Sequence, residues 1–290
     1  MFANTFKTTI LLSAMGGLIV AVVTLLGGGS SGAVMIGFVM ALVMVGGSYW
    51  FSDTLALKSA KAQIISEADH PEFYGVVRNL SHRAGLPMPR VAISPSEQPN
   101  AFATGRGPNK AVVCATRGLL TSLSHEEIKG VMAHELMHVK HRDILIGSVA
   151  AGVATAISSI AQMAMFASMF SGGRNNDNRS NPIAVILIAL LAPMSAMLIQ
   201  MAISRSREFD ADRGAAELLG NAEPLARALE KIEVIAAQIP MQVAPAQAQA
   251  YIHNPLAGMQ RRSGGLNMSK LFSTHPNMQE RISRLRAMSF

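Results

Sequence analysis

Long uncharged apolar stretches interrupt the ordinary mixture of polar and apolar residues in this chain. Thr8 to Gly27 and Gly32 to Phe51 carry no charge. Each has about the 20 residues that a helix needs to cross the apolar core of a bilayer. Ile144 to Gly173 and Ser180 to Ser204 are also uncharged. The pattern predicts four transmembrane helices, the first two joined as a hairpin by the glycine- and serine-rich turn at 27–32.

The first and third stretches each allow a second interpretation. The first would also fit a cleaved signal peptide with Lys7 as its basic flank. It is long for the apolar part of a signal peptide, however, and a second apolar stretch follows almost at once. The third is rich in Ala, Ser and Gly, as packed membrane helices often are, but would also fit a buried core helix. We predict a retained hairpin followed by a second membrane pair.

Basic residues beside the apolar stretches predict their orientation, because cytoplasmic loops carry an excess of Lys and Arg. The turn at 27–32 carries no charge, and the loop at 172–179 has two arginines against one aspartate. The flanking basic residues are Lys7, Lys58, Lys61, Lys140, Arg142, Arg205 and Arg207. The consistent solution places both ends of the chain and its soluble segments on the cytoplasmic side.

Between and after these stretches the pattern becomes that of a soluble α+β domain. Apolar residues at helical spacing predict a helix from Ser66 to Gly85, with Gly85 as its C-cap. The predicted strands cover 90–94, 100–104 and 110–116. Further predicted helices cover 124–141, 206–219, 222–237 and 277–288. The segment 240–273 is rich in Pro, Gln, Ala and Gly and is predicted to be a mobile loop.

Composition narrows the class of protein. Charged residues make up 15% of the chain, against about 25% in soluble domains. The net charge is +7, but Lys and Arg are spread along the chain and cluster near the apolar stretches. This distribution favours anionic lipid headgroups over nucleic acid as the partner. The one cysteine, Cys114, lies in a strand-like run, so we expect a buried thiol and no intramolecular disulfide.

The most specific chemical pattern is His134-Glu135-Leu136-Met137-His138. Ser124 and Glu127 form a capping box that starts the helix carrying it. Two imidazoles four residues apart lie on one helical face and can share a zinc ion. Glu135 lies beside the metal and can move a proton between water and a leaving amine. The alternative is a helix that carries two histidines and a glutamate by chance.

A catalytic zinc takes three protein ligands and keeps one position open. Glu208 and Asp212 are four residues apart and share a helical face. One can bind zinc while the other orients a ligating histidine. The longer Glu208 is our choice of ligand, with Asp212 behind it. On spacing alone, a solvated acidic face paired with Arg205 and Arg207 is an equally good interpretation.

Other histidines fit less well. His141 lies near the face of His134, but nothing like Glu135 accompanies it, and His125 is in the first turn of the helix. His253 and His275 lie in or beside the predicted loop. His275 is either exposed or close to a developing oxyanion.

Five segments together resemble the HtpX membrane proteases, relatives of the CAAX prenyl proteases. They are Pro99 to Gly105, His134 to His138, Arg207 to Asp212, Thr274 to Pro276, and Arg281-Ile282. The zinc motif alone is shared by many families, and its combination with the Glu-Phe-x-Ala-Asp segment is specific. The resemblance covers essentially the whole chain.

The resemblance implies one zinc ion bound by His134, His138 and Glu208, with Glu135 as the catalytic carboxylate. His275 and Arg281 match a C-terminal segment expected near the active site. The resemblance further implies a role in quality control of misfolded or damaged proteins at the cell inner membrane, often under stress. The expected partners are unfolded or membrane protein substrates and the lipid bilayer. Whether the chain forms a homo-oligomer is left open.

The expected fold is an α+β zincin-like (gluzincin) metallopeptidase domain with a small β-sheet, plus four transmembrane α-helices. The expected parts are an N-terminal transmembrane hairpin (1–57), a first peptidase part with the zinc helix (58–143), a second membrane pair (144–204) and a second peptidase part (205–290). We expect a zinc metalloendopeptidase whose substrate pairs with an edge strand at Asn100 to Thr104. The alternatives are a prenyl-protein peptidase and a non-enzymatic membrane scaffold with a structural zinc site.

Overall fold

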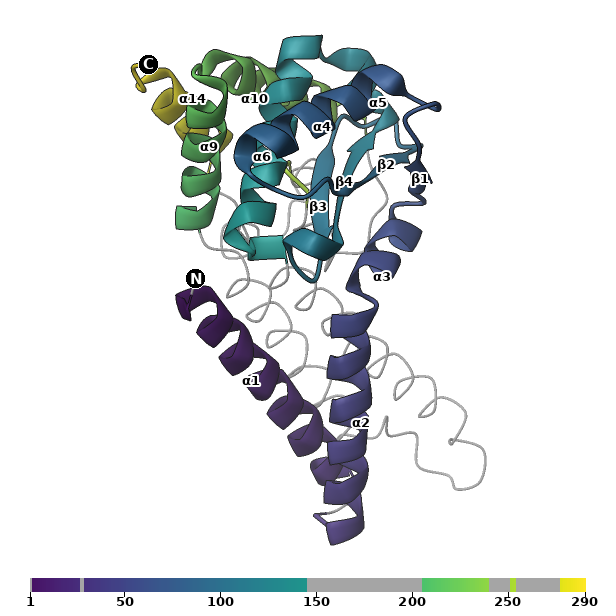
Figure 1. Ribbon diagram of the computed structural model, residues 1–290. Coiled ribbons are helices and arrows are strands. Elements are labelled where there is room, and N and C mark those ends of the chain that lie inside the picture. The colour runs from purple at the N-terminus through teal and green to yellow at the C-terminus, as the bar shows by residue number, and fades with distance from the viewer. Residues whose placement is uncertain (1, 27–28, 145–204, 240–250, 254–276) are drawn as a thin grey trace.

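A helical hairpin and a soluble domain make up the part of the chain that the structure describes. The computed structural model describes residues 2–26, 29–144, 205–239, 251–253 and 277–290 (Figure 1). The hairpin consists of α1 (Phe2–Leu26) and α2 (Ser31–Trp50) and extends away from the domain. Of the described helices, only α2 is long and apolar enough to cross a membrane by length and composition, and α1 carries a shorter apolar stretch, Leu12–Ala21.

The structure therefore supplies one candidate for the four expected transmembrane helices. The third and fourth predicted spans, 144–173 and 180–204, lie outside the described residues apart from Ile144. The same holds for most of the predicted loop at 240–273, of which Tyr251–His253 is described.

The two faces of α2 differ in the size of their side chains. Its buried residues are small: Ala33, Gly37, Ala41 and Ser48. A Cβ added to Gly37 would lie 3.1 Å from the Cα of Val20 in α1, so the two helices approach closely there. Its exposed apolar residues are large: Val34, Met35, Ile36, Phe38, Val39, Leu42 and Val43. Small residues between helices and large apolar residues outside are the distribution expected in lipid.

The soluble domain is built on a four-stranded mixed sheet in the order β1-β2-β4-β3. Its strands are β1 (Gln63–Ile65), β2 (Arg90–Ser94), β3 (Ala101–Gly105) and β4 (Ala111–Thr116). β2 and β4 are parallel, whereas β1 and β3 pair antiparallel with their neighbours. β3 and β4 are buried along their whole length, so both faces of the sheet are covered at these two strands.

Helices cover one face of this sheet and form the main core with it (Figure 1). The larger ones are α4 (Pro71–Ala84), α6 (His125–His141), α9 (Arg205–Leu219), α10 (Glu223–Ala236) and α14 (Met278–Arg286). The shorter ones are α3 (Ser52–Ser59), α5 (Arg117–Ser122) and the 3₁₀ turn η1 (Pro108–Lys110). A smaller cluster on the other face joins Phe102, Cys114 and Tyr251 to residues of α3. Cys114 is fully buried, as predicted.

Segment Tyr251–His253 lies against the outer edge of β3. The Ile252 N–H donates to the carbonyl of Ala101 at 3.0 Å, and Phe102 and Tyr251 form an antiparallel bridge. The Asn100 side chain exchanges two hydrogen bonds with the backbone of His253, at 2.8 Å and 3.2 Å. The segment thus extends the sheet by a short length beyond β3.

The predicted helices and strands of the soluble domain are present, but several boundaries differ. The helix predicted from Ser66 begins at Pro71, because Ser66 and Asp69 form a hydrogen-bonded turn and the residue before a proline avoids the helical conformation. Its predicted end is confirmed, since Gly85 has a left-handed φ of 68°. β1, α3 and α5 were not predicted, because three to eight residues of mixed polarity carry too little periodicity.

Candidate metal centre

α6 carries the His134 to His138 motif through the centre of the domain. The predicted capping box is present: the Ser124 hydroxyl accepts from the Glu127 N–H, and the Ser124 N–H donates to the Glu127 carboxylate at 2.8 Å. The helix then runs against β3, β4, α4, α9 and α10. His134 and Glu135 are only 1% and 2% exposed, so their polar atoms must find partners inside the protein.

The structure brings the three predicted ligands together. The Nε2 atoms of His134 and His138 lie 3.1 Å apart. Carboxylate oxygens of Glu208, on α9, lie 3.8 Å and 3.5 Å from these two nitrogens. One ligand atom from each residue lies within 4.8 Å of the other two. Ligand atoms bound tetrahedrally at about 2.0–2.1 Å would be roughly 3.3 Å apart, so the group fits a zinc-sized ion.

Asp212 lies behind His134, on the side away from Glu208. Its Oδ1 is 2.9 Å from the Nδ1 of His134. Arg281, from α14, donates to both Asp212 oxygens, at 2.7 Å and 2.9 Å. Burial alone would raise the pKa of Asp212, but the Arg281 guanidinium holds that pKa below its usual range. With Glu208 and Asp212 6% and 2% exposed, the interpretation of this pair as a solvated acidic face is wrong.

Glu135 occupies a different position from the ligands. Burial raises its pKa to about 7, the Glu208 carboxylate adds to the rise, and a backbone hydrogen bond from Ala103 opposes it. Ala103 belongs to β3, so the carboxyl group of Glu135 adjoins the edge strand. A carboxyl group with a pKa near neutrality is suited to accepting and releasing a proton at working pH.

His138 has a carboxylate behind it as well. Its Nδ1 is 3.4 Å from Oδ2 of Asp143, just beyond the end of α6. Burial would lower the pKa of His138, but the hydrogen bond with Asp143 and the Glu208 and Glu135 carboxylates outweigh it and raise the pKa to about 9. Arg207, next to Glu208 on α9, lies 3.8 Å from the other Asp143 oxygen.

Other candidates from the sequence lie elsewhere. His125 contacts Glu72 on the exposed side of α4 at 2.9 Å. His275 lies outside the described residues. Asp143 was missed by the sequence analysis, although its place five residues after His138, just past the helix end, was a usable signal.

Comparisons with known proteins agree with this geometry. The profile of Peptidase family M48 matches residues 67–289. The chain is 49% identical to the "Protease HtpX homolog" of Syntrophobacter fumaroxidans over 287 residues, with 98% of this chain and 99% of the relative covered. It is 51% identical over 289 residues to proteins of the same name from Methylibium petroleiphilum and Burkholderia mallei, with 98–99% of this chain and 97–98% of each relative covered.

A crystal structure of S. mikatae Ste24p has a similar fold. The TM-score is 0.51 at 20% identity, with 98% of this chain and 65% of that chain covered. The match therefore supports the fold alone.

The fold and the centre define a metallopeptidase. The chain belongs to Peptidase family M48, and the expected resemblance to the HtpX proteases is confirmed over nearly its full length.

Proposed function

We propose that this chain is a zinc-dependent endopeptidase with His134, His138 and Glu208 as ligands and Glu135 as the catalytic carboxylate. The observation that carries the proposal is the convergence of three ligand atoms within 4.8 Å beside a buried carboxyl group whose pKa is raised. Two imidazoles and one carboxylate are a common catalytic zinc set. A structural zinc site has four protein ligands. Among the described residues, the cluster of side chains that could hold a metal ion has three.

The residues around the centre have separate roles in the reaction. A bound zinc ion supplies Lewis-acid polarisation of the scissile carbonyl. Glu135 takes a proton from the attacking water and delivers it to the leaving amine. Asp212 fixes the ring of His134 through its Nδ1, and Arg281 holds Asp212 in place. These fixed groups are aligned before the substrate arrives, which lowers the cost of reaching the transition state.

The substrate would add as an extended chain to the edge of β3. Segment Tyr251–His253 already covers this edge at Ala101. Tyr251 and Ile252 are 4% and 2% exposed, and displacing two such side chains would cost about 3–6 kcal/mol. The substrate would therefore pair beyond this segment, toward Gly105, next to the point where the backbone of Ala103 donates to the Glu135 carboxyl group. Backbone pairing of this kind reads little sequence, which suits unfolded clients.

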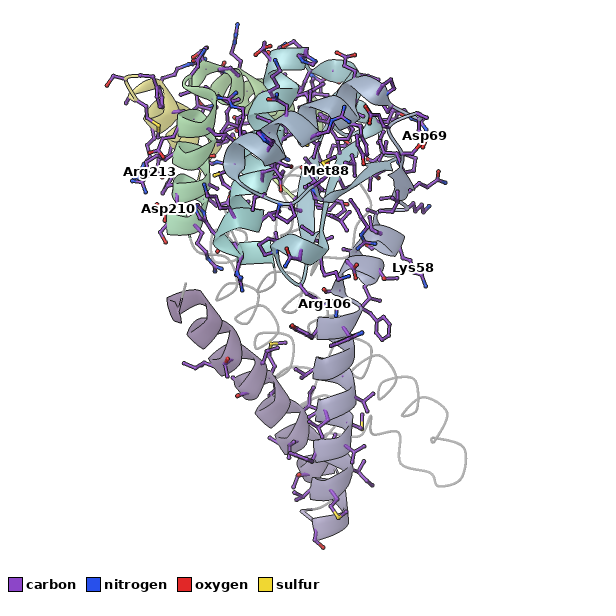
Figure 2. All side chains as sticks on the ribbon, viewed as in Figure 1. Lys58, Asp69, Met88, Arg106, Asp210 and Arg213 are labelled. Atoms are coloured by element: carbon purple, nitrogen blue, oxygen red, sulfur yellow. The ribbon has the colours of Figure 1, made fainter. Side chains whose placement is uncertain are left out.

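The proposed clients are misfolded or damaged membrane proteins of the cell inner membrane. Support comes from the position of β3 relative to the hairpin. Arg106, directly after β3, stacks over the ring of Trp50 at the end of α2, 4.4 Å from its centroid (Figure 2). The end of β3 that precedes Arg106 is thus next to the end of the candidate membrane helix. A chain leaving the membrane surface would meet this edge first.

The test replaces Glu135 by Gln in the full-length protein. We expect zinc to stay bound at one ion per chain, while cleavage of an unfolded model protein falls by at least about 100-fold. Glu126→Gln is the matched control, because Glu126 is exposed on the same helix and pairs with Lys129. Undiminished cleavage by the Glu135→Gln protein would contradict this mechanism. Cleavage of prenylated peptides but not of plain ones would favour a prenyl-protein peptidase instead.

A further inference from the structure

The two histidines of the centre have parallel surroundings. Each directs Nε2 toward the other ligands, and each has an aspartate at Nδ1: Asp212 behind His134 and Asp143 behind His138. Each aspartate in turn lies beside an arginine. A carboxylate that accepts from Nδ1–H leaves the lone pair of the ring on Nε2, the atom that binds the metal, and fixes the ring orientation.

We propose that Asp143, paired with Arg207, is the positioning residue that orients His138 for metal binding. The Asp143 side chain is 8% exposed, with His138 and Arg207 at 15% and 17%, so water does not fully replace their contacts. The inference rests on the proposed zinc centre and adds a role for two residues outside its ligand set.

The end of α6 brings Asp143 into this position. Arg142 is the C-cap residue, with the left-handed φ of 62°, and its N–H donates to the carbonyls of His138 and Val139. This turn ends α6 directly before Asp143, whose Oδ2 lies 3.4 Å from the Nδ1 of His138. A left-handed conformation is unfavourable for a residue other than glycine. The contact between Asp143 and His138 is therefore held by a specific backbone turn.

α9 contributes residues to the surroundings of both histidines. Arg207 and Glu208 are neighbours in its first turn, so the same turn supplies a ligand and the arginine for Asp143. Asp212 follows one turn later and serves His134. The contacts around Asp143, at 3.4 Å and 3.8 Å, are longer than those around Asp212, at 2.9 Å and 2.7 Å. We therefore expect Asp143 to contribute less to metal affinity than Asp212.

The main experiment measures zinc affinity by competition with a chelator for the full-length protein in detergent. Asp143→Ala should weaken zinc binding about 10- to 100-fold. Asp143→Asn keeps an oxygen that can accept from Nδ1–H and should weaken it only a few-fold. The matched control is Asp210→Asn, because Asp210 is exposed on α9 and pairs with Arg213 (Figure 2). Zinc affinity unchanged in Asp143→Ala would overturn the proposal.

A second readout separates positioning from simple structural support. Cobalt(II) in place of zinc has an absorption spectrum that reports the geometry of its ligands. We expect this spectrum to change in Asp143→Ala and to return toward the wild-type form in Asp143→Asn. An unchanged spectrum in both variants, with a lower unfolding temperature of the metal-free protein, would show a structural role only and overturn the proposal.

Arg207 and Arg142 give two further tests that leave Asp143 in place. If Arg207 acts through Asp143, adding Arg207→Gln to Asp143→Ala should weaken zinc binding no further. Arg142→Gly keeps the left-handed turn and should keep wild-type affinity, whereas Arg142→Val opposes that turn and should weaken binding. Equal affinity in the two Arg142 variants would contradict the role of the turn.

Absence of zinc binding in the wild-type protein would overturn the zinc centre itself, whereas wild-type binding with unchanged Asp143 variants would overturn only this inference.

Discussion

Several buried charged residues among those described contact groups of opposite charge, because an unpaired buried charge is costly. Among the described residues, Arg281 is the largest fully buried side chain, and it faces both Asp212 and Glu208, at 2.7 Å and 3.5 Å. Replacing one member of such a buried ion pair by a neutral residue lowers the free energy of unfolding by about 3–5 kcal/mol. Glu127 follows the same rule away from the metal centre. It is 3% exposed and binds both the Ser124 N–H and the Lys231 ammonium group, at 2.8 Å each.

Glu127 should make the stability of the domain depend on acid pH. Burial would raise the pKa of Glu127, but hydrogen bonds from Lys231 and Ser124 outweigh it and lower the pKa. Its contribution is therefore fully present above the ordinary pKa of about 4.5 and disappears as pH falls through the lowered pKa. We expect Glu127→Gln to destabilise the protein by about 1–2 kcal/mol at pH 7 and by much less near pH 3.

Denaturant unfolding of both proteins at the two pH values checks this. Glu126→Gln is the control, since Glu126 is its exposed neighbour. A Glu127→Gln difference that is the same at both pH values would contradict the expected role of the charge.

Elements whose sequence carries both a start signal and a periodic face were predicted well. α6 begins after Ser124 and ends at His141, as the capping box and the spacing of its residues predict. β2 matches its predicted bounds, whereas β3 and β4 differ by one residue at the ends. Local patterns determine such elements.

Contacts between distant segments were not predictable in the same way. Asp143 contacts Arg207, which is 64 positions later in the sequence (207 minus 143). Ile252 pairs with Ala101, although Ile252 lies in a segment that was predicted to be a loop. Neither contact leaves a periodic signal, because each depends on how the elements pack. The position of Glu208 beside the histidines likewise follows from packing of α9 on α6, and spacing alone left two interpretations of it.

Two glycines at helix crossings should respond differently to the same substitution. A Cβ at Gly130, on α6, would lie 2.7 Å and 2.8 Å from backbone atoms of Leu225 in α10. A Cβ at Gly214, on α9, would lie nearest to the flexible side chain of Met137, with its Cγ and Sδ at 2.9 Å. We expect Gly130→Ala to destabilise the protein by about 1–3 kcal/mol. In Gly214→Ala, movement of Met137 and a helix-propensity gain of about 1 kcal/mol should leave stability nearly unchanged.

Thermal unfolding of the metal-free variants distinguishes the two sites. Equal losses of stability in both would show that backbone contact at Gly130 does not limit the approach of α6 and α10.

On the scale of the whole molecule, the centre joins segments from both sides of the 145–204 region. His134 lies on the first side, and Glu208 and Asp212 lie on the second. Arg281 reaches His134 across 147 positions. The hairpin is tied to the same domain by α3 and by the stacking of Arg106 on Trp50. The orientation of the candidate membrane helix α2 would therefore determine the side of the membrane on which proteolysis occurs.

The flanking charges predict a cytoplasmic domain, and single cysteines can test this. Cys114 is buried and burial raises the pKa of its thiol, so it should not react in the folded protein. Ser31, at the start of α2, and Lys58 and Arg213 on the domain are exposed. In intact cells, a membrane-impermeant maleimide should label Ser31→Cys and leave Lys58→Cys and Arg213→Cys unlabelled until the membrane is opened. Labelling of Lys58→Cys in intact cells, with Ser31→Cys protected, would reverse the orientation. The wild-type protein, unlabelled before and after opening, is the control for Cys114.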